Sequence, residues 1–217
     1  MKRTAPIQTQ TLPAGGEGVV EQAVDLLGRG HLVAFPTDTV YGLGAHALLP
    51  RAVAHLYAVK ERPPRLAIPL LLDDASTMYR VCVDIPQLAW DLAERFWPGA
   101  LSLVLRRAAG VPGVVTSGGA TVAVRVPDHA LVREICRRLG APLAATSANL
   151  HGRPDPGTAD EVFASLAGRI PLILDGGRCP GGVPSTLLDL TVMPPVILRI
   201  GPITADELSG FLEPHAR

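Results

Sequence analysis

The side chains best suited to chemistry cluster in residues 36–45, PTDTVYGLGA, which directly follow the apolar run at residues 32–35. That run predicts a short buried strand, and the turn after it carries two threonines, an aspartate, a tyrosine and two glycines. Hydroxyl groups and bare backbone at the carboxyl end of a strand are typical of a small-molecule site in an α/β sheet. A tight turn rich in small residues is the alternative, although such a turn needs only one or two of these residues.

Two cations in the segment KERPPR are candidates for binding phosphate oxygens. A helix is predicted up to Lys60, and Arg62 lies just past it. The spacing of the two residues in an extended segment would direct both side chains the same way. Arginine offers phosphate a planar fork, whereas lysine offers a compact point charge. A solvated basic loop is the alternative interpretation of this stretch.

Polar side chains also accompany two further predicted strands. Residues 121–126 alternate strictly, so that Thr121 and Arg125 share one face. An arginine in such a strand usually lines a cavity or pairs with an acid. Ser147 and Asn149 follow another strand and would share a face if extended, but on their own they are equally typical of a turn.

Several familiar catalytic motifs are missing from the sequence. It contains no G-x-x-x-x-G-K-[S/T] phosphate loop and no G-x-S-x-G nucleophile elbow. Residues 42–47 fit the G-x-G-x-x-G/A dinucleotide pattern loosely, but they begin several residues past the strand. The six histidines show no metal-ligand spacing. Hydroxyls, amides and cations without an obvious nucleophile suit the binding of an anionic substrate and electrostatic catalysis of group transfer.

The composition limits the class of protein. The 217 residues are 47% hydrophobic, enough for a sizeable core, and 20 basic residues balance 20 acidic ones, so global charge gives no sign of a polyanion binder. Three widely spaced cysteines argue against a disulfide framework and a zinc site. No apolar stretch approaches the roughly 18 residues of a membrane span, and the amino terminus lacks an apolar signal segment. We therefore expect a cytoplasmic protein without a membrane segment.

Helical and strand patterns alternate along the chain and predict an α/β or α+β sheet protein. We expect one domain over residues 17–212, a flexible arm over residues 1–16 and a tail over residues 213–217. Asp128 is placed to cap one helix, and Thr158 opens another because a glutamate follows at capping-box spacing. The predicted strands lie at residues 32–35, 69–72, 101–105, 121–126, 142–146, 170–174, 185–190 and 196–200.

Taken together, these segments resemble the YrdC-like threonylcarbamoyl-AMP synthases in their single-domain form. The resemblance covers about residues 17 to 212, and its motifs are specific as a set and in their order. The matching segments are PTDTVYGLGA (36–45), KERP (60–63), PGALSLVL (98–105), TVAVRVPDH (121–129), TSANLHGRPDP (146–156), PSTLLDL (184–190) and ILRIGPIT (197–204).

The resemblance implies a twisted, mostly open mixed α/β sheet with flanking helices around a large basic cavity. It also implies an enzyme, a nucleotidyltransferase that joins L-threonine, bicarbonate and ATP into threonylcarbamoyl-AMP with release of pyrophosphate and with Mg²⁺ accompanying ATP. A separate tRNA threonylcarbamoyl transferase complex would take the product for modification of tRNA, and weak binding of tRNA or other double-stranded RNA is a further expectation.

By family position, nine residues are expected to form the site. Thr39, Thr121, Arg125, Ser147 and Ser185 would surround threonine, whereas Lys60, Arg62, Asn149 and Arg199 would hold ATP. Lys60 and Arg62 would stabilise the charge that builds on the phosphate oxygens, and the resemblance assigns no metal ligands. The link over residues 63–68 is longer and more apolar at its end than is usual in the family, so we assign no site residue within it.

Two other functions remain open on the sequence. One is a nucleic-acid-binding module that uses the same basic cavity, for which RNA affinity would fall steeply with salt. The other is a carbamoyl-adenylate enzyme, similar to the related domain of hydrogenase-maturation carbamoyltransferases, which would use carbamoyl phosphate in place of threonine.

Overall fold

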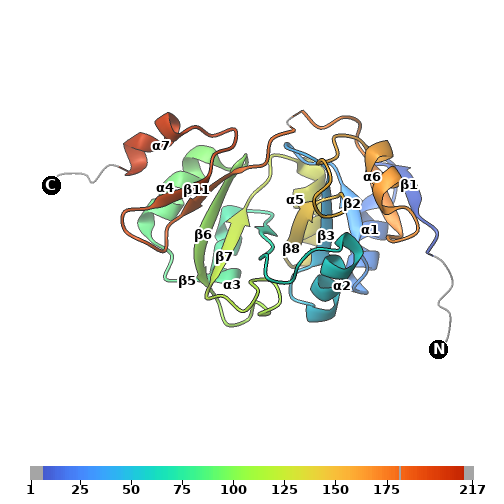
Figure 1. The fold of residues 1–217 in the computed structure, drawn as a ribbon, viewed down its shortest axis with the longest axis horizontal. Coiled ribbons are helices and arrows are strands. Elements are labelled where there is room, and N and C mark those ends of the chain that lie inside the picture. Colours follow the sequence, from blue (N-terminus) through green and yellow to red (C-terminus); the bar gives the residue numbers. More distant parts are fainter. Residues whose placement is uncertain (1–6, 181, 213–217) are drawn as a thin grey trace.

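The computed structural model describes residues 7–180 and 182–212, and it confirms the predicted α/β class (Figure 1). Within these residues eleven strands form one open sheet of parallel and antiparallel pairs, in the order β1-β9-β2-β3-β8-β4-β7-β6-β10-β11, with β5 paired to β6. The strands are β1 (Gln10–Pro13), β2 (Val33–Phe35), β3 (Gly42–His46), β4 (Leu70–Leu71), β5 (Cys82–Val83), β6 (Leu101–Arg107), β7 (Thr121–Arg125), β8 (Leu143–Ser147), β9 (Leu172–Asp175), β10 (Thr186–Asp189) and β11 (Val196–Arg199). The helices are α1 (Val19–Gly28), α2 (Pro50–Lys60), α3 (Met78–Val81), α4 (Gln87–Phe96), α5 (Ala130–Leu139), α6 (Ala159–Leu166) and α7 (Ala205–Leu212).

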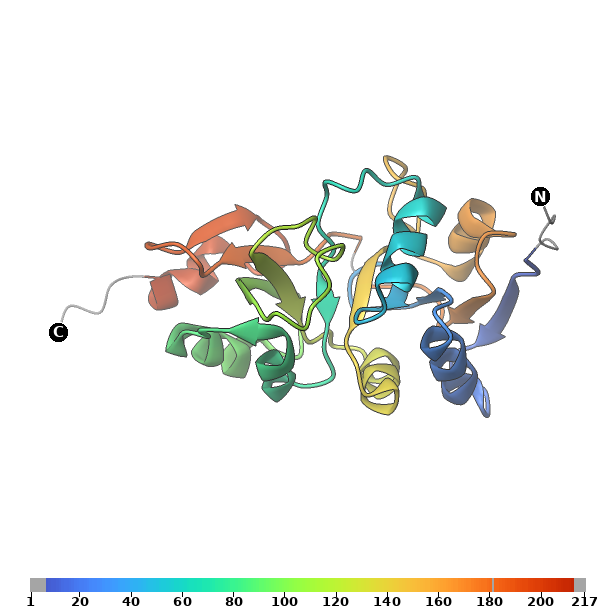
Figure 2. The ribbon, with the colours of Figure 1, turned by 90° about the horizontal axis from the view of Figure 1, so that it is seen from below.

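The helices flank the twisted sheet on two sides of the molecule. Figure 2 shows α1, α5, α3 and α4 along one side, with α2 and α6 on the opposite side. Apolar residues of α1 and α5 pack on β2, β8 and β9, where Leu27, Phe35 and Ile135 are fully buried. None of the described helices has the length and apolar character needed to cross a membrane. The helices packed on both faces make the sheet a rigid support for the loops at its strand ends.

Strand β1 corrects part of the predicted N-terminal arm. It lies at one edge of the sheet and pairs in parallel with β9, with Gln10 opposite Leu172 and Pro13 opposite Asp175. Its side chains are mostly exposed, so backbone pairing and not an apolar face places it in the sheet. Residues 1–6 and the predicted tail at residues 213–217 lie outside the described residues.

The second half of the threonine-rich motif is a strand and not part of a turn. β3 pairs antiparallel with β2 on one side and with β8 on the other. Both glycines of the motif face the ring of Phe35: a Cβ atom at Gly44 would lie 2.6 Å from Phe35 Cε1, and one at Gly42 would lie 2.9 Å from Phe35 Cε2. The buried ring therefore requires glycine at these positions, because packed cores have little room for an added methyl group.

We expect Gly44→Ala to lower the free energy of unfolding by about 1–3 kcal/mol, the usual cost of overpacking a core. The clash involves a fully buried aromatic ring between two strands, which cannot swing into solvent. Urea denaturation measures the change. Gly28→Ala, at the end of α1 where a Cβ would meet nothing within 4 Å, is the matched control and should leave stability nearly unchanged. Equal stabilities for the two variants would contradict the packing role.

The helix ends follow the predicted signals with one exception. Thr158 and Glu161 form the predicted capping box of α6, and Gly140 ends α5 with a φ of 66°. Asp128 is not the cap of α5: His129 holds that position, with no side-chain hydrogen bond to the helix. The prediction failed there because the helix begins one residue later than the spacing of apolar residues indicated.

Candidate active site

A pocket of about 540 Å³ lies between the turn after β2, strands β6, β7 and β10, and the segment that follows α2. It is lined by all five side chains expected to surround threonine and by two of the four expected to hold ATP. These are Thr39, Thr121, Arg125, Ser147, Ser185, Arg62 and Arg199. Lys60 and Asn149 do not contribute to the lining. Among the described residues, the ionisable side chains in the lining are three arginines and Asp155.

The turn after β2 is closed by its own hydroxyl groups. Thr37 Oγ1 accepts hydrogen bonds from the backbone N–H groups of Thr39, at 3.1 Å, and Val40, at 3.3 Å, and it donates to the Val40 carbonyl at 2.7 Å. Because that hydroxyl has one proton, the 3.0 Å contact between Thr37 and Thr39 is donated by Thr39. The turn thus presents the oxygen of Thr39 to the pocket as a hydrogen-bond acceptor.

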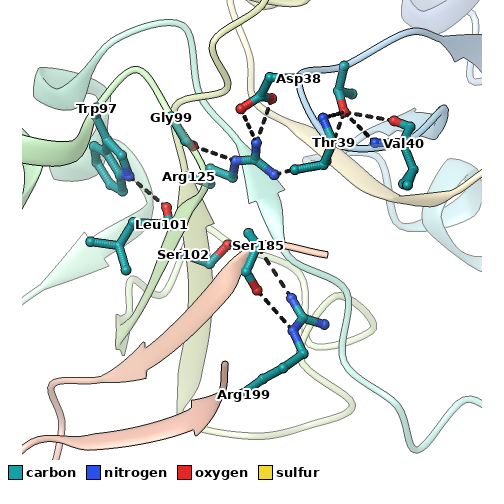
Figure 3. A network of polar contacts seen from close by, with 11 residues as sticks. Asp38, Thr39, Val40, Trp97, Gly99, Leu101, Ser102, Arg125, Ser185 and Arg199 are labelled. Carbon is teal, nitrogen blue, oxygen red and sulfur yellow. Dashed lines mark hydrogen bonds and ion pairs between the residues drawn. The ribbon is translucent and has the colours of Figure 1, made fainter. Parts of the chain in front are cut away.

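Arg125 ends strand β7 and is held on three sides (Figure 3). Its Nε donates to the carbonyl of Gly99 at 2.7 Å, its Nη2 donates to both carboxylate oxygens of Asp38, and its Nη1 lies 3.4 Å from Thr39 Oγ1. Burial lowers the pKa of Arg125, and the charge of Asp38 opposes that shift. Arg125 both lines the cavity and pairs with an acid, which confirms the two environments considered from its place in an apolar strand.

Ser185 lies at the opposite wall, in a second network of polar contacts (Figure 3). Its Oγ lies 2.8 Å from Ser102 Oγ on β6 and accepts a 3.3 Å hydrogen bond from Nη2 of Arg199. Nε of Arg199 also donates to the Ser185 carbonyl at 2.9 Å. Ser102 is 2% exposed and was not predicted as a site residue, although it is the single hydroxyl within the apolar run LSLVL.

Lys60 occupies a different environment from Arg62, which corrects the expectation that both side chains point the same way. Lys60 ends α2, and Glu61 then takes a φ of 54°, so the segment from Lys60 to Arg62 is not extended. Lys60 is 1% exposed, and its ammonium group donates to the carbonyls of Ser147 and Asn149 and to Oδ1 of Asn149. Burial and the charge of Arg62 lower the pKa of Lys60 to about 8. In this geometry Lys60 holds the segment after β8 in place.

Asn149 belongs to the same buried cluster. Its Oδ1 accepts from Lys60 at 2.9 Å and from Ser147 Oγ at 2.7 Å, while its Nδ2 donates to the carbonyl of Arg153 and lies 3.3 Å from Asp155 Oδ1. Ser147 and Asn149 are therefore adjacent, as predicted, but Ser147 alone of the pair lines the pocket. Asn149 links the buried lysine to the pocket carboxylate Asp155.

Arg62 is fixed by the link over residues 63–68 that follows it. Its Nε lies 3.3 Å from the carbonyl of Leu66 and its Nη2 lies 3.1 Å from the carbonyl of Ala67, and half-burial lowers its pKa. Backbone carbonyls of residues 63–68 thus orient the guanidinium that lines the pocket. The apolar end of the link contributes Ala67 and Ile68 to the lining, where the sequence assigned no site residue.

Tyr41 of the motif anchors the glycine-rich connection between β9 and β10. Its hydroxyl donates to the carbonyl of Gly177 at 2.8 Å and accepts from the N–H of Gly176 at 3.1 Å. Burial raises the pKa of Tyr41 to about 12, so the phenol stays neutral. A 2.9 Å hydrogen bond from the N–H of Gly182 to the carbonyl of Thr39 joins the same connection to the pocket turn. Tyr41 is thus a structural member of the motif.

The side chains of the pocket could bind Mg²⁺ only together with other ligands, such as the phosphates of a nucleotide. The described residues contain no group of three or more histidine, cysteine or acidic side chains that could hold a metal ion. Mg²⁺ in phosphate-binding enzymes commonly uses one or two carboxylates together with substrate phosphates and water. Asp155 is the carboxylate that the pocket offers for this purpose.

Comparison with known proteins finds relatives of this chain in sequence and in structure. The family model Sua5_yciO_yrdC, described as telomere recombination, matches residues 25–201. The threonylcarbamoyl-AMP synthase of Pyrococcus abyssi is 42% identical over 196 residues, which cover 90% of this chain and 58% of that protein. A putative threonylcarbamoyl-AMP synthase of Mycobacterium tuberculosis is 36% identical over 195 residues, which cover 90% of this chain and 89% of that protein.

Among solved structures, P. abyssi Sua5 complexed with L-threonine superposes with a TM-score of 0.89 at 39% identity, over 96% of this chain and 61% of that one. This chain therefore spans less than two thirds of the length of the Pyrococcus protein and about nine tenths of the mycobacterial one.

Proposed function

Because the chain belongs to the Sua5–YciO–YrdC family, we propose that it is an L-threonylcarbamoyladenylate synthase, a nucleotidyltransferase that condenses L-threonine, bicarbonate and ATP to threonylcarbamoyl-AMP, pyrophosphate and water. The observation that carries the proposal is the convergence of Thr39, Arg125 and Ser185 on one pocket with Arg62 and Arg199. The P. abyssi relative was crystallised with L-threonine, which supports threonine as the amino acid for this chain.

In the proposed complex, Arg125 pairs with the threonine carboxylate, and the hydroxyls of Thr39 and Ser185 receive the side-chain hydroxyl. The neutral amine then adds to CO2 derived from bicarbonate and becomes an N-carboxylate, whose oxygen attacks the α-phosphorus of ATP while pyrophosphate leaves. Holding the reactants together removes much of the entropic barrier to this condensation.

The phosphate end of the proposed site uses Arg62 and Arg199. Negative charge shifts onto phosphate oxygens as pyrophosphate leaves, so a guanidinium fixed beforehand stabilises the transition state more than the ground state. Mg²⁺ bound by the phosphates and Asp155 would neutralise part of the same charge. Lys60 acts in this scheme through Ser147 and Asn149, whose backbone carbonyls it binds.

Further steps of the pathway follow from the chemistry of the product. A threonylcarbamoyl group on AMP is a mixed anhydride, so the product is activated for transfer and must be consumed by an acyl transferase. We expect that role to fall to a tRNA threonylcarbamoyl transferase complex in the cytoplasm, with weak binding of tRNA by this chain.

The experiment that tests the proposed function is pyrophosphate release from ATP and Mg²⁺, with threonine and bicarbonate each omitted in turn. Release that requires both substrates supports adenylate synthesis. Intact ATP with both substrates present would overturn it in favour of a binding module. Turnover with carbamoyl phosphate and without threonine would assign the chain to carbamoyl-adenylate chemistry instead.

Arg125→Ala is expected to raise the KM for threonine by about 10²-fold, since a buried, charge-assisted contact with the substrate carboxylate is lost. The KM for ATP should change by less than about threefold, because Arg62 and Arg199 remain. Initial rates measured at varied threonine and at varied ATP concentrations give the two KM values separately. Arg106→Ala removes an exposed arginine from the neighbouring strand β6 and is the matched control. An unchanged threonine KM in Arg125→Ala would contradict the assignment.

A further inference from the structure

Asp38 is the side chain next to the proposed threonine subsite that family position did not assign. It lies in the turn after β2, its side chain is 15% exposed, and both its oxygens accept from Nη2 of Arg125 (Figure 3). Hydrogen bonds of Thr37 close the turn that carries Asp38. Asp38 is not itself among the residues that line the pocket, but it contacts Arg125, which is.

The ion pair with Asp38 limits which nitrogen atoms of Arg125 can bind an anion. Its Nε is occupied by the carbonyl of Gly99 and its Nη2 by Asp38, so an incoming carboxylate meets Nη1, the nitrogen that faces Thr39. With Asp38 alongside, the subsite presents one positive and one negative charge and not a bare cation. A bare carboxylate is repelled by Asp38 as well as attracted by Arg125.

An α-amino acid matches this pair of charges. Its ammonium group is attached to the carbon that bears its carboxylate, so a ligand carboxylate on Nη1 of Arg125 brings the amine beside Asp38. A carboxylate has about four acceptor positions, and the ion pair with Arg125 uses two of those on Asp38. The carboxylate that lines the pocket, Asp155, is held 3.3 Å from Asn149 Nδ2 in the cluster after β8.

We propose that Asp38 accepts a hydrogen bond from the α-amino group of the amino-acid substrate, and that the Asp38–Arg125 pair selects α-amino acids over carboxylic acids that lack the amine. The inference rests on the proposed function, because it concerns the amino-acid end of that pocket. After the ammonium gives its proton to bicarbonate, which yields CO2 and water, the contact keeps one N–H on Asp38 and directs the nitrogen lone pair away from the carboxylate and toward the CO2.

A purely positioning role for Asp38 has a different signature. If Asp38 only orients Arg125, its loss weakens every ligand that uses Arg125 by the same factor. If it binds the amine, its loss weakens amino-bearing ligands alone. A ligand pair that differs only in the amine therefore separates the two roles.

The test compares L-threonine with 3-hydroxybutanoate of the same configuration at C3, which keeps the carboxylate and the hydroxyl but has no amine. Calorimetry should give wild-type protein at least about 10-fold tighter binding of threonine, the value of one hydrogen bond to a charged group. In Asp38→Asn we expect that ratio to fall at least about fivefold. A ratio unchanged in Asp38→Asn, with both affinities reduced equally, would overturn the proposal.

Two further variants complete the test. Asp128→Asn removes an exposed carboxylate just beyond β7 and should keep the wild-type ratio. Asp38→Glu retains the charge beside Arg125 but displaces it, so it serves if Asp38→Asn does not fold, and its ratio must fall at least about twofold. If wild-type protein releases pyrophosphate with threonine but its Asp38 variants keep the wild-type affinity ratio, the role of Asp38 is refuted and the proposed function stands. Failure of wild-type protein to bind threonine refutes both the proposed function and this site.

Discussion

Replacing Lys60 with methionine is expected to lower the free energy of unfolding by about 2–4 kcal/mol and to abolish most adenylate synthesis. Methionine fills a similar volume, but it donates no hydrogen bond to the Ser147 carbonyl or to the two oxygens of Asn149 that Lys60 now binds. Buried acceptors left without donors each cost free energy. The segment after β8, which supplies Ser147 to the pocket, should then lose its fixed position.

Chemical denaturation of Lys60→Met against wild-type protein measures the loss. Arg51→Met, at an exposed position of the same helix, is the matched control and should change stability by less than about 0.5 kcal/mol. Full stability in Lys60→Met together with lost activity would contradict this account and would instead indicate that Lys60 contacts ATP directly.

The pKa of Lys60 adds a pH signature to the same variant. The pKa is about 8 in the folded protein, against an ordinary value of 10.5, so between these values the unfolded chain binds more protons than the native one. The contribution of this group to stability therefore rises as the pH increases from about 8 to about 10. The wild-type stability curve should show that rise relative to Lys60→Met across this window, and parallel curves would contradict the lowered pKa.

Local patterns predicted the described helices except the four-residue α3, together with most strands, and they failed where contacts with residues distant in the chain set the structure. The elements β2, α2 and β7 follow from apolar spacing because each buries its own pattern. Strand β3 has the sequence GLGAH, which lacks the β-branched residues typical of strands, and its conformation is set by β2 and β8 on both sides and by the ring of Phe35.

The site shows the same division between local and distant information. Family position predicted nine site residues, of which seven line one pocket, and strand alternation placed Thr121 and Arg125 on one face. Asp38 was missed as a partner of Arg125 because the two are 87 residues apart in the chain. The direction of Lys60 was missed because it depends on the positive φ of Glu61, a conformation that a glutamate does not signal.

Arg62→Ala is expected to lower turnover by about 10²-fold or more, in the range found for other lost electrostatic contacts to a transition state. The free energy of unfolding should change little, because Arg62 binds only the carbonyls of Leu66 and Ala67 at the half-buried surface of the pocket. The ATP dependence of pyrophosphate release gives kcat and KM separately. A fall in kcat larger than the rise in KM would place the interaction in the transition state.

Two further substitutions at this link test why an arginine is needed. Arg62→Lys keeps the charge but loses the planar fork and the carbonyl contacts that orient it, so its turnover should lie between those of wild type and Arg62→Ala. Arg65→Ala removes an exposed arginine from the same link, outside the pocket lining, and should retain turnover within about threefold. Equal losses at residues 62 and 65 would mean that the link acts through its overall charge, whereas a loss confined to Arg62 ties the effect to the guanidinium that the Leu66 and Ala67 carbonyls orient.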